Sequence, residues 1–217
     1  NMQIDATTRR SLELTASMNG GRAGSLLSTI DRTSTSGGAR LLERRLSSPS
    51  CHLETILERQ ASVGWLLENT RLAADLGGLL RASHDVDRAL SRLALERGGP
   101  RDMAAIRDTA AIAAKVRERL SGDAPSGIAS AAENLVGLAE IVDLLDAALV
   151  AEPPLLSRDG GYVAPGYDAD LDDARELRDH GRGVIAGMQA DYAELAGVSS
   201  LKIKHNNVLG YFIETTA

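Results

Sequence analysis

The C-terminal stretch SLKIKHNNVLGYFIETTA, residues 200–217, has a different pattern from the rest of the chain. Apolar residues alternate with Lys202 and Lys204, which is the period of a β-strand. Asn206 and Asn207 follow, and after them comes a β-branched and aromatic run. We predict two short strands that close into a hairpin, with the tight turn at the asparagine pair because asparagine tolerates positive φ.

The two hundred residues before this stretch have a helical pattern and are rich in Ala, Leu, Arg and Asp. Aromatic residues make up only 3% of the chain, so the core must be built mainly from aliphatic side chains. We therefore predict a mostly all-α fold, a multi-helix bundle. The expected helices cover residues 6–14, a three-turn segment through Leu41, Leu42 and Leu46, then 53–67, 72–80 with a break near Gly77 and Gly78, 86–93, 100–120 and 128–149.

The helix expected from Asp168 to Ala196 carries an apolar stripe of a different kind. Its members recur at alternating steps of three and four residues, as in the seam between two paired helices. Gly181, Gly183 and Gly187 each cost roughly 0.5–1 kcal/mol relative to alanine inside a helix, so close packing against a partner must compensate. The stripe consists of Leu177, Gly181, Val184, Met188, Tyr192 and Leu195.

Composition also limits the classes of protein to consider. The single Cys51 rules out an internal disulfide, and no apolar run reaches the roughly 18 residues of a membrane span. We expect a cytoplasmic protein with no membrane partner. The net charge of −6 argues against a nucleic-acid-binding face over most of the surface. Of only three lysines, however, two lie in the C-terminal stretch.

Several short motifs have a partial likeness to sites of known chemistry. GGRAGSLL, residues 20–27, lacks the P-loop spacing and is interpreted as a structural loop. DADLDD, residues 168–173, lacks the glycine and glutamate of a calcium loop and is interpreted as an acidic helix start. The four histidines share no metal-ligand spacing, and no hydrolase motif is present. The sequence predicts no catalytic residue, cofactor site or metal site.

The C-terminal stretch is the one segment with a candidate function. Lys202 and Lys204 on one strand face, with His205, Asn206 and Asn207 beside them, are candidates to contact DNA phosphates. A solvated strand face is the open alternative. Two neutralised phosphates change affinity only about tenfold between 50 and 200 mM salt, so this contact cannot hold DNA by itself.

Six stretches of the chain resemble the MutS-type DNA mismatch repair proteins. The resemblance covers nearly the whole chain and falls on the family's central core (lever) domain and the first part of its clamp domain. Each stretch alone is modest in specificity, whereas six in the family's order at compatible spacing make a specific match. They read IDATTRRSLELT, GSLLSTIDRTSTSGGARLLERRLSSP, LERQASVGWL, DVDRALSRLALERGGPRDMAAIRD, RDGGYVAPGYDADLDDARELR and LKIKHNNVLGYFIE.

This resemblance implies roles for the two C-terminal elements. It assigns residues 1–196 to the helical core or lever domain and residues 197–217 to the start of a truncated clamp domain. The stripe helix is then the lever arm that leads to the clamp, and the hairpin is the clamp's first strands. The helix that returns beside the lever arm in the family is not in this sequence. We therefore expect disorder, strand pairing or a helix-swapped dimer at the cut end.

The resemblance also implies what the complete protein does. In the family, a C-terminal domain with a Walker A loop binds ATP and Mg, and an N-terminal domain probes mismatched double-stranded DNA with a Phe-x-Glu motif. The protein is a homodimer. Phe212 and Glu214 match that spelling but lie in the clamp-like segment. The fragment itself is expected to be non-catalytic, to hold no cofactor, and to transmit nucleotide-dependent change between the other domains and the clamp.

The chain departs from the family's pattern around one helix. The family usually has a methionine at the position of Gly37 and often a tryptophan at the position of Arg45. An aliphatic residue is common at the position of Ser50. None is a catalytic position, and we expect looser packing of that helix.

Three alternatives remain open: a helical protein-interaction scaffold without a DNA role, a hydrolase with an unrecognised site, and a MutS paralogue that serves recombination. Reversing the charges of Lys202 and Lys204 separates the scaffold from the DNA hypothesis, because only the latter predicts weaker duplex binding. A hydrolase requires a pocket of converging titratable residues. Only the other domains distinguish the paralogue.

Overall fold

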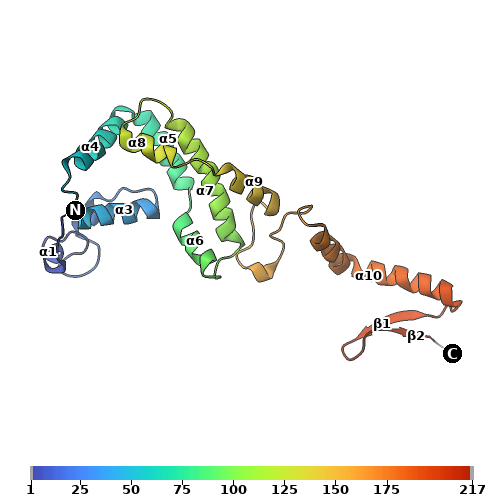
Figure 1. Ribbon diagram of the computed structural model, residues 1–217. Coiled ribbons are helices and arrows are strands. Elements are labelled where there is room, and N and C mark those ends of the chain that lie inside the picture. Colours follow the sequence, from blue (N-terminus) through green and yellow to red (C-terminus); the bar gives the residue numbers. More distant parts are fainter. Residues whose placement is uncertain (1, 216–217) are drawn as a thin grey trace. The chain divides into compact units, whose positions relative to one another are not determined.

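The computed structural model describes residues 2–215, and the chain divides into two compact units, Asn1–Ala164 and Pro165–Ala217. Helices make up the first unit, and the second contains one long helix and a two-stranded antiparallel sheet (Figure 1). The prediction of a mostly all-α fold with a C-terminal hairpin is confirmed. The predicted division between core and clamp at residues 196 and 197 stays a prediction, and Thr216 and Ala217 lie outside the described residues.

Two helices of the first unit begin at the expected capping residues. Asp5 Oδ1 accepts the Thr8 N–H at 2.8 Å, and Thr35 Oγ1 accepts the Gly38 N–H at 2.9 Å, so α1 and α3 start there. The helices are α1 (Ala6–Ser11), α2 (Leu26–Ile30), α3 (Ser36–Ser47), α4 (Leu53–Glu68), α5 (Thr70–Ala82), α6 (Val86–Ala94), α7 (Pro100–Arg119), α8 (Ser126–Glu133) and α9 (Ala139–Ala148), followed by a 3₁₀ turn at Ser157–Asp159.

The helix α7 is central to the first unit, since it packs against α5, α6, α8 and α9 (Figure 1). The buried side chains on and around it are small or aliphatic: Leu76, Ala89, Ala104, Ala110 and Leu149. Alanines at such positions allow neighbouring helices to approach closely, because no long side chain separates them. This core agrees with the low aromatic content of the sequence.

One buried arginine joins α7 to the segment after α9. Arg107 is only 7% exposed, and its guanidinium donates to the carbonyl oxygens of Ala151 at 3.0 Å and Val150 at 3.4 Å. Its Nε also donates to Asp108 Oδ1 at 2.9 Å. Because a buried charge is costly unless it is paired and hydrogen-bonded, these contacts fix the chain direction after α9.

A small second core lies near the N-terminus. Leu27 is 1% exposed and Ser25 is fully buried. The Leu27 N–H donates to the Leu14 carbonyl at 2.9 Å, and Ser25 Oγ accepts the Ser28 N–H, which begins α2. The GGRAGSLL segment therefore acts in the structure as a packed loop and helix start, in agreement with the prediction of a structural loop.

Two helix predictions were wrong. The expected break at Gly77 and Gly78 does not occur, because α5 runs without interruption from Thr70 to Ala82. A helical glycine costs only about 1 kcal/mol relative to alanine, and packing against α4 and α7 outweighs that cost. Conversely, the long helix expected over residues 128–149 is two helices, α8 and α9. Gly137, with φ of 74°, lies in the segment between them, in a left-handed conformation that no α-helix contains.

The three departures from the family's pattern lie near α3. A Cβ added at Gly37 would meet only the Arg40 side chain, at 4.0 Å. Arg45 is exposed, and its pKa is lowered by partial burial and then by the positive charges of Arg59 and Arg44. Ser50 Oγ accepts the His52 N–H at 3.2 Å. No described residue of α3 is buried, and the looser packing expected there stays a prediction.

The second unit consists of α10 (Ala169–Ala196) and a hairpin of β1 (Lys202–Asn206) and β2 (Gly210–Glu214). Asp168 Oδ1 accepts the Leu171 N–H at 2.9 Å, so the acidic segment is a helix start, as predicted. Gly197 ends α10 in the left-handed conformation, with φ of 65°. The non-glycine residues of the predicted stripe are exposed to different degrees, from Met188 at 38% to Leu195 at 89%.

Candidate nucleic-acid interface

The register of the hairpin determines which candidate residues share a face. Lys202 lies opposite Glu214, Lys204 opposite Phe212, and His205 opposite Tyr211. Because side chains alternate along a strand, the two lysines and Asn206 lie on one face and His205 lies on the other. The hairpin was predicted correctly, but the five candidate residues do not form one continuous surface.

The strand β1 is attached to α10 along its outer edge. The Ile203 N–H donates to the side-chain oxygen Oε1 of Gln189 on α10 at 3.0 Å. Leu201, just before the strand, is 6% exposed, and Ile203 is half-buried. On α10, Ile185, Gln189 and Ala193 share the less exposed flank. These contacts hold the hairpin at the end of the helix while leaving the lysines in solvent.

Only one of the two lysines keeps a free charge. Lys204 Nζ forms an ion pair with Glu214 Oε2, both about half exposed. Lys202 makes no ion pair within the described part of the chain. The positive charge that the hairpin presents to a phosphate is therefore smaller than the two lysines suggest, unless Lys204 exchanges its carboxylate for the phosphate.

The asparagine pair forms the turn by a mechanism other than the predicted one. Among residues 2–215, positive φ values in this hairpin occur only at Gly210, at 70°. The Asn206 side-chain oxygen Oδ1 instead accepts the N–H groups of Val208 at 3.0 Å and Leu209 at 2.7 Å. Asparagine closes the turn here with its side chain rather than with its backbone. Asn207 is exposed in the loop.

The opposite face and the tip of the hairpin contain groups that sequence reasoning missed. The rings of His205 and Tyr211 lie edge to face, with centroids 4.8 Å apart and planes at 62°. Val208 at the tip is 91% exposed, and Leu209 is 68% exposed. The signal for this tip was present in the sequence, because two aliphatic residues separate the asparagine pair from Gly210 in a segment too short to bury them.

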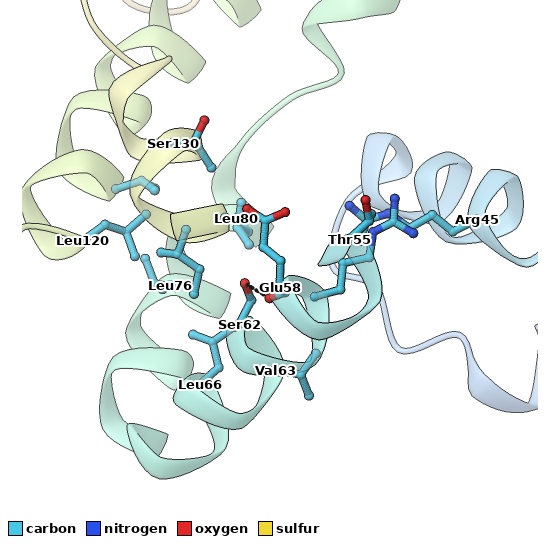
Figure 2. Close-up of a pocket in the computed structure, with 15 residues that line it drawn as sticks. Arg45, Thr55, Glu58, Ser62, Val63, Leu66, Leu76, Leu80, Leu120 and Ser130 are labelled. Atoms are coloured by element: carbon cyan, nitrogen blue, oxygen red, sulfur yellow. Dashed lines mark hydrogen bonds between the residues drawn. The ribbon is translucent and has the colours of Figure 1, made fainter. Parts of the chain in front are cut away.

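A hollow of about 650 Å³ with a largely apolar lining lies in the first unit. Figure 2 shows Leu76, Leu80 and Leu120 around it, with Glu58 and Ser62 on α4. A Cβ added at Gly127 would meet Ser62 Oγ at 3.1 Å, so α8 closes against α4 at this glycine. The hollow is suited to apolar side chains, and the charged residues in its lining are Arg45, Glu58 and Arg59.

The described residues, 2–215, contain neither a cluster of metal-ligating side chains nor a membrane-spanning helix. No group of three or more His, Cys, Asp or Glu side chains in that range is placed to hold a metal ion. None of the described helices combines the length and apolar character that crossing a membrane requires.

Comparison with known proteins gives a consistent result. Residues 7–207 match the family model for MutS domain III. The chain is 63% identical over 217 residues to the DNA mismatch repair protein MutS of Ruegeria pomeroyi, 63% over 216 residues to that of Paracoccus denitrificans and 60% over 217 residues to that of Dinoroseobacter shibae. In each case the match covers 100% of this chain and 25% of the relative, so the chain spans about a quarter of their length.

Proposed function

Because the chain belongs to the MutS family of DNA mismatch repair proteins, we propose that it is the non-catalytic core or lever region that joins an ATPase domain to a DNA-embracing clamp. In this role it transmits nucleotide-dependent conformational change and binds no cofactor of its own. ATP and Mg act elsewhere in the complete protein. That protein works in the cytoplasm as a homodimer on mismatched double-stranded DNA.

The geometry of α10 is the observation that supports this proposal most strongly. The helix has 28 residues and so spans roughly 42 Å at a rise of 1.5 Å per residue. Leu177, Val184 and Tyr192 on its stripe are 57%, 41% and 40% exposed. Exposed apolar residues at seam spacing fit a second helix that packs alongside. A paired helix of this length is stiff enough to carry displacement to the hairpin at its end.

The hairpin provides the contact to DNA in this proposal. Lys202 presents a free charge, and Lys204 lies on the same face. Asn206 and Asn207 are exposed near them, and His205 is exposed on the opposite face, so all five predicted residues remain candidate phosphate contacts. The small number of charges suits a clamp that closes around a duplex without reading its sequence.

The decisive experiment reverses these charges in a complete MutS protein with this sequence. We expect Lys202→Glu combined with Lys204→Glu to weaken duplex binding and to reduce the salt slope by about 0.9, because each phosphate contact contributes about 0.9 and Lys204 is paired with Glu214. Lys115→Glu on α7 is the matched control, since Lys115 is the third lysine of the chain. Equal losses from both changes would contradict a DNA role for the hairpin.

A second candidate function is supported by the hollow between α4, α5, α7 and α8. Its apolar lining fits the protein-interaction scaffold, in which a partner's side chains fill it. That function predicts unchanged duplex binding in the lysine variants. It also predicts lost partner binding when Leu80, which is 42% exposed at the hollow, is replaced by aspartate.

A further inference from the structure

A second hollow of the first unit, of about 680 Å³, has a different chemistry. It lies where α6, the turn before α7 and the segment after α9 meet. Four arginines line it, together with two aspartates, and the remaining lining is largely small or apolar. The charged residues are Arg88, Arg92, Arg97, Arg101, Asp85 and Asp102.

Both aspartates of this hollow are already committed to other groups. Asp85 accepts two hydrogen bonds from the Arg40 guanidinium, at 2.7 and 2.9 Å, and these lower its pKa. Asp102 pairs with Arg92, which lowers its pKa, and its Oδ2 accepts the Gly99 N–H at 3.0 Å. Each carboxylate therefore has its charge balanced, and Asp102 also occupies the N-terminus of α7.

The remaining arginines carry positive charge that the hollow does not neutralise. Arg97 is exposed, and its side chain makes no hydrogen bond or ion pair with any residue in the described range, although its backbone N–H donates to the Arg92 carbonyl at 2.8 Å. Arg101 uses only its Nε, which donates to the Pro153 carbonyl at 3.2 Å, so its terminal NH₂ groups are available. Arg88 lies 3.4 Å from Asp85, a carboxylate already held by Arg40. Three guanidinium groups thus border one hollow in a chain whose net charge is −6.

We infer that this arginine hollow is a phosphate-binding site. Guanidinium groups present paired N–H donors that match the oxygens of a phosphate, and such charge-assisted bonds are stronger than neutral ones. Several cations around one space favour an oxyanion with more than one negative charge. The phosphate can come from a DNA backbone or from a free phosphate group. Only the first of these two sources rests on the proposed function, which this inference deepens.

Calorimetric titration of the 217-residue chain with inorganic pyrophosphate at low ionic strength tests the site. We expect saturable binding that weakens at least about tenfold for each of Arg97→Gln and Arg101→Gln, since a hydrogen bond to a charged group is lost each time. The matched control is Arg71→Gln on α5, an exposed arginine away from the hollow. Succinate, a dicarboxylate with the same charge sign, should bind more weakly.

A second measurement needs no substitution. In the unmodified chain, pyrophosphate should shift the NMR signal of the Arg97 side-chain Nε–H and leave that of Arg71 in place. Absence of saturable binding, equal losses in the control variant, or succinate binding as tightly as pyrophosphate would each overturn the inference.

Competition identifies the source of the phosphate. If a short duplex displaces pyrophosphate, the source is a nucleic-acid backbone. If the duplex leaves pyrophosphate bound, the source is a free phosphate group. Lys202→Glu with Lys204→Glu should leave pyrophosphate binding unchanged. Failure of the hairpin's DNA role and failure of this site are therefore separate results.

Discussion

Replacing Gly181 by alanine tests whether α10 packs against a partner helix. Gly181 lies on the predicted stripe and is half-buried, and a Cβ added there has no atom within 4 Å in the described part of this chain. In the chain alone the substitution should stabilise α10 by about 1 kcal/mol, the difference in helix propensity between the two residues. In the complete protein the added methyl group should instead collide with the partner helix and cost about 1–3 kcal/mol.

Gly183 provides the control on the same helix. At 3.6 residues per turn it lies about 200° around the axis from Gly181, and its Cβ also has open space. Gly183→Ala should therefore stabilise α10 equally in both proteins. Of these two glycines, only Gly181 falls on the predicted stripe.

Amide hydrogen exchange over α10 measures both effects. A stabilisation of about 1 kcal/mol slows exchange about fivefold through local opening. We expect slower exchange for both variants in this chain, and faster exchange for Gly181→Ala alone in the complete protein. If Gly181→Ala slowed exchange to the same degree in both proteins, no helix would pack closely on the stripe and the lever proposal would lose its main support.

Three further predictions concern single contacts. Gly98→Ala should lower the urea midpoint, because the new Cβ would lie 2.9 Å from the Leu93 Cα and overpacking costs about 1–3 kcal/mol; an unchanged midpoint would show that the turn adapts freely. The hydrogen bond from Arg40 lowers the Asp85 pKa, so its stabilisation is present above the unfolded value of about 3.9 and is lost as pH falls through the folded value. Denaturation at pH 7 and pH 3 should accordingly show a smaller acid loss in Asp85→Asn than in the parent, and equal losses would argue against this pairing. Glu214→Gln in the complete protein should free Lys204 and steepen the salt slope of duplex binding by about 0.9. Anisotropy titrations would measure this slope. An unaltered slope would mean that Lys204 does not reach phosphate.

Local signals explain which parts of the fold were predictable. Asp5, Thr35, Pro100 and Asp168 each begin or precede a helix as expected, because capping depends on a few neighbouring residues. The split between α8 and α9 was missed because apolar periodicity continues across it. Gly137 gives a local signal there, but a glycine is equally compatible with a helix, as α5 shows.

The candidate sites depended more on contacts between distant residues. The hairpin lysines were found from their spacing, but the ion pair of Lys204 with Glu214 is a diagonal contact between the strands, because the register places Glu214 opposite Lys202. The sequence did not predict Arg97 and Arg101 as site residues, because arginine is common in this chain. Their relation to the segment after α9 arises only once α7 and that segment are packed together.

The hydrogen bond from the Ile203 N–H to Gln189 determines at which edge the small sheet can accept another strand. Because the outer edge of β1 is bonded to α10 at Ile203, an additional strand would join the sheet beside β2. A larger sheet built on this nucleus would extend away from the helix, one strand after another.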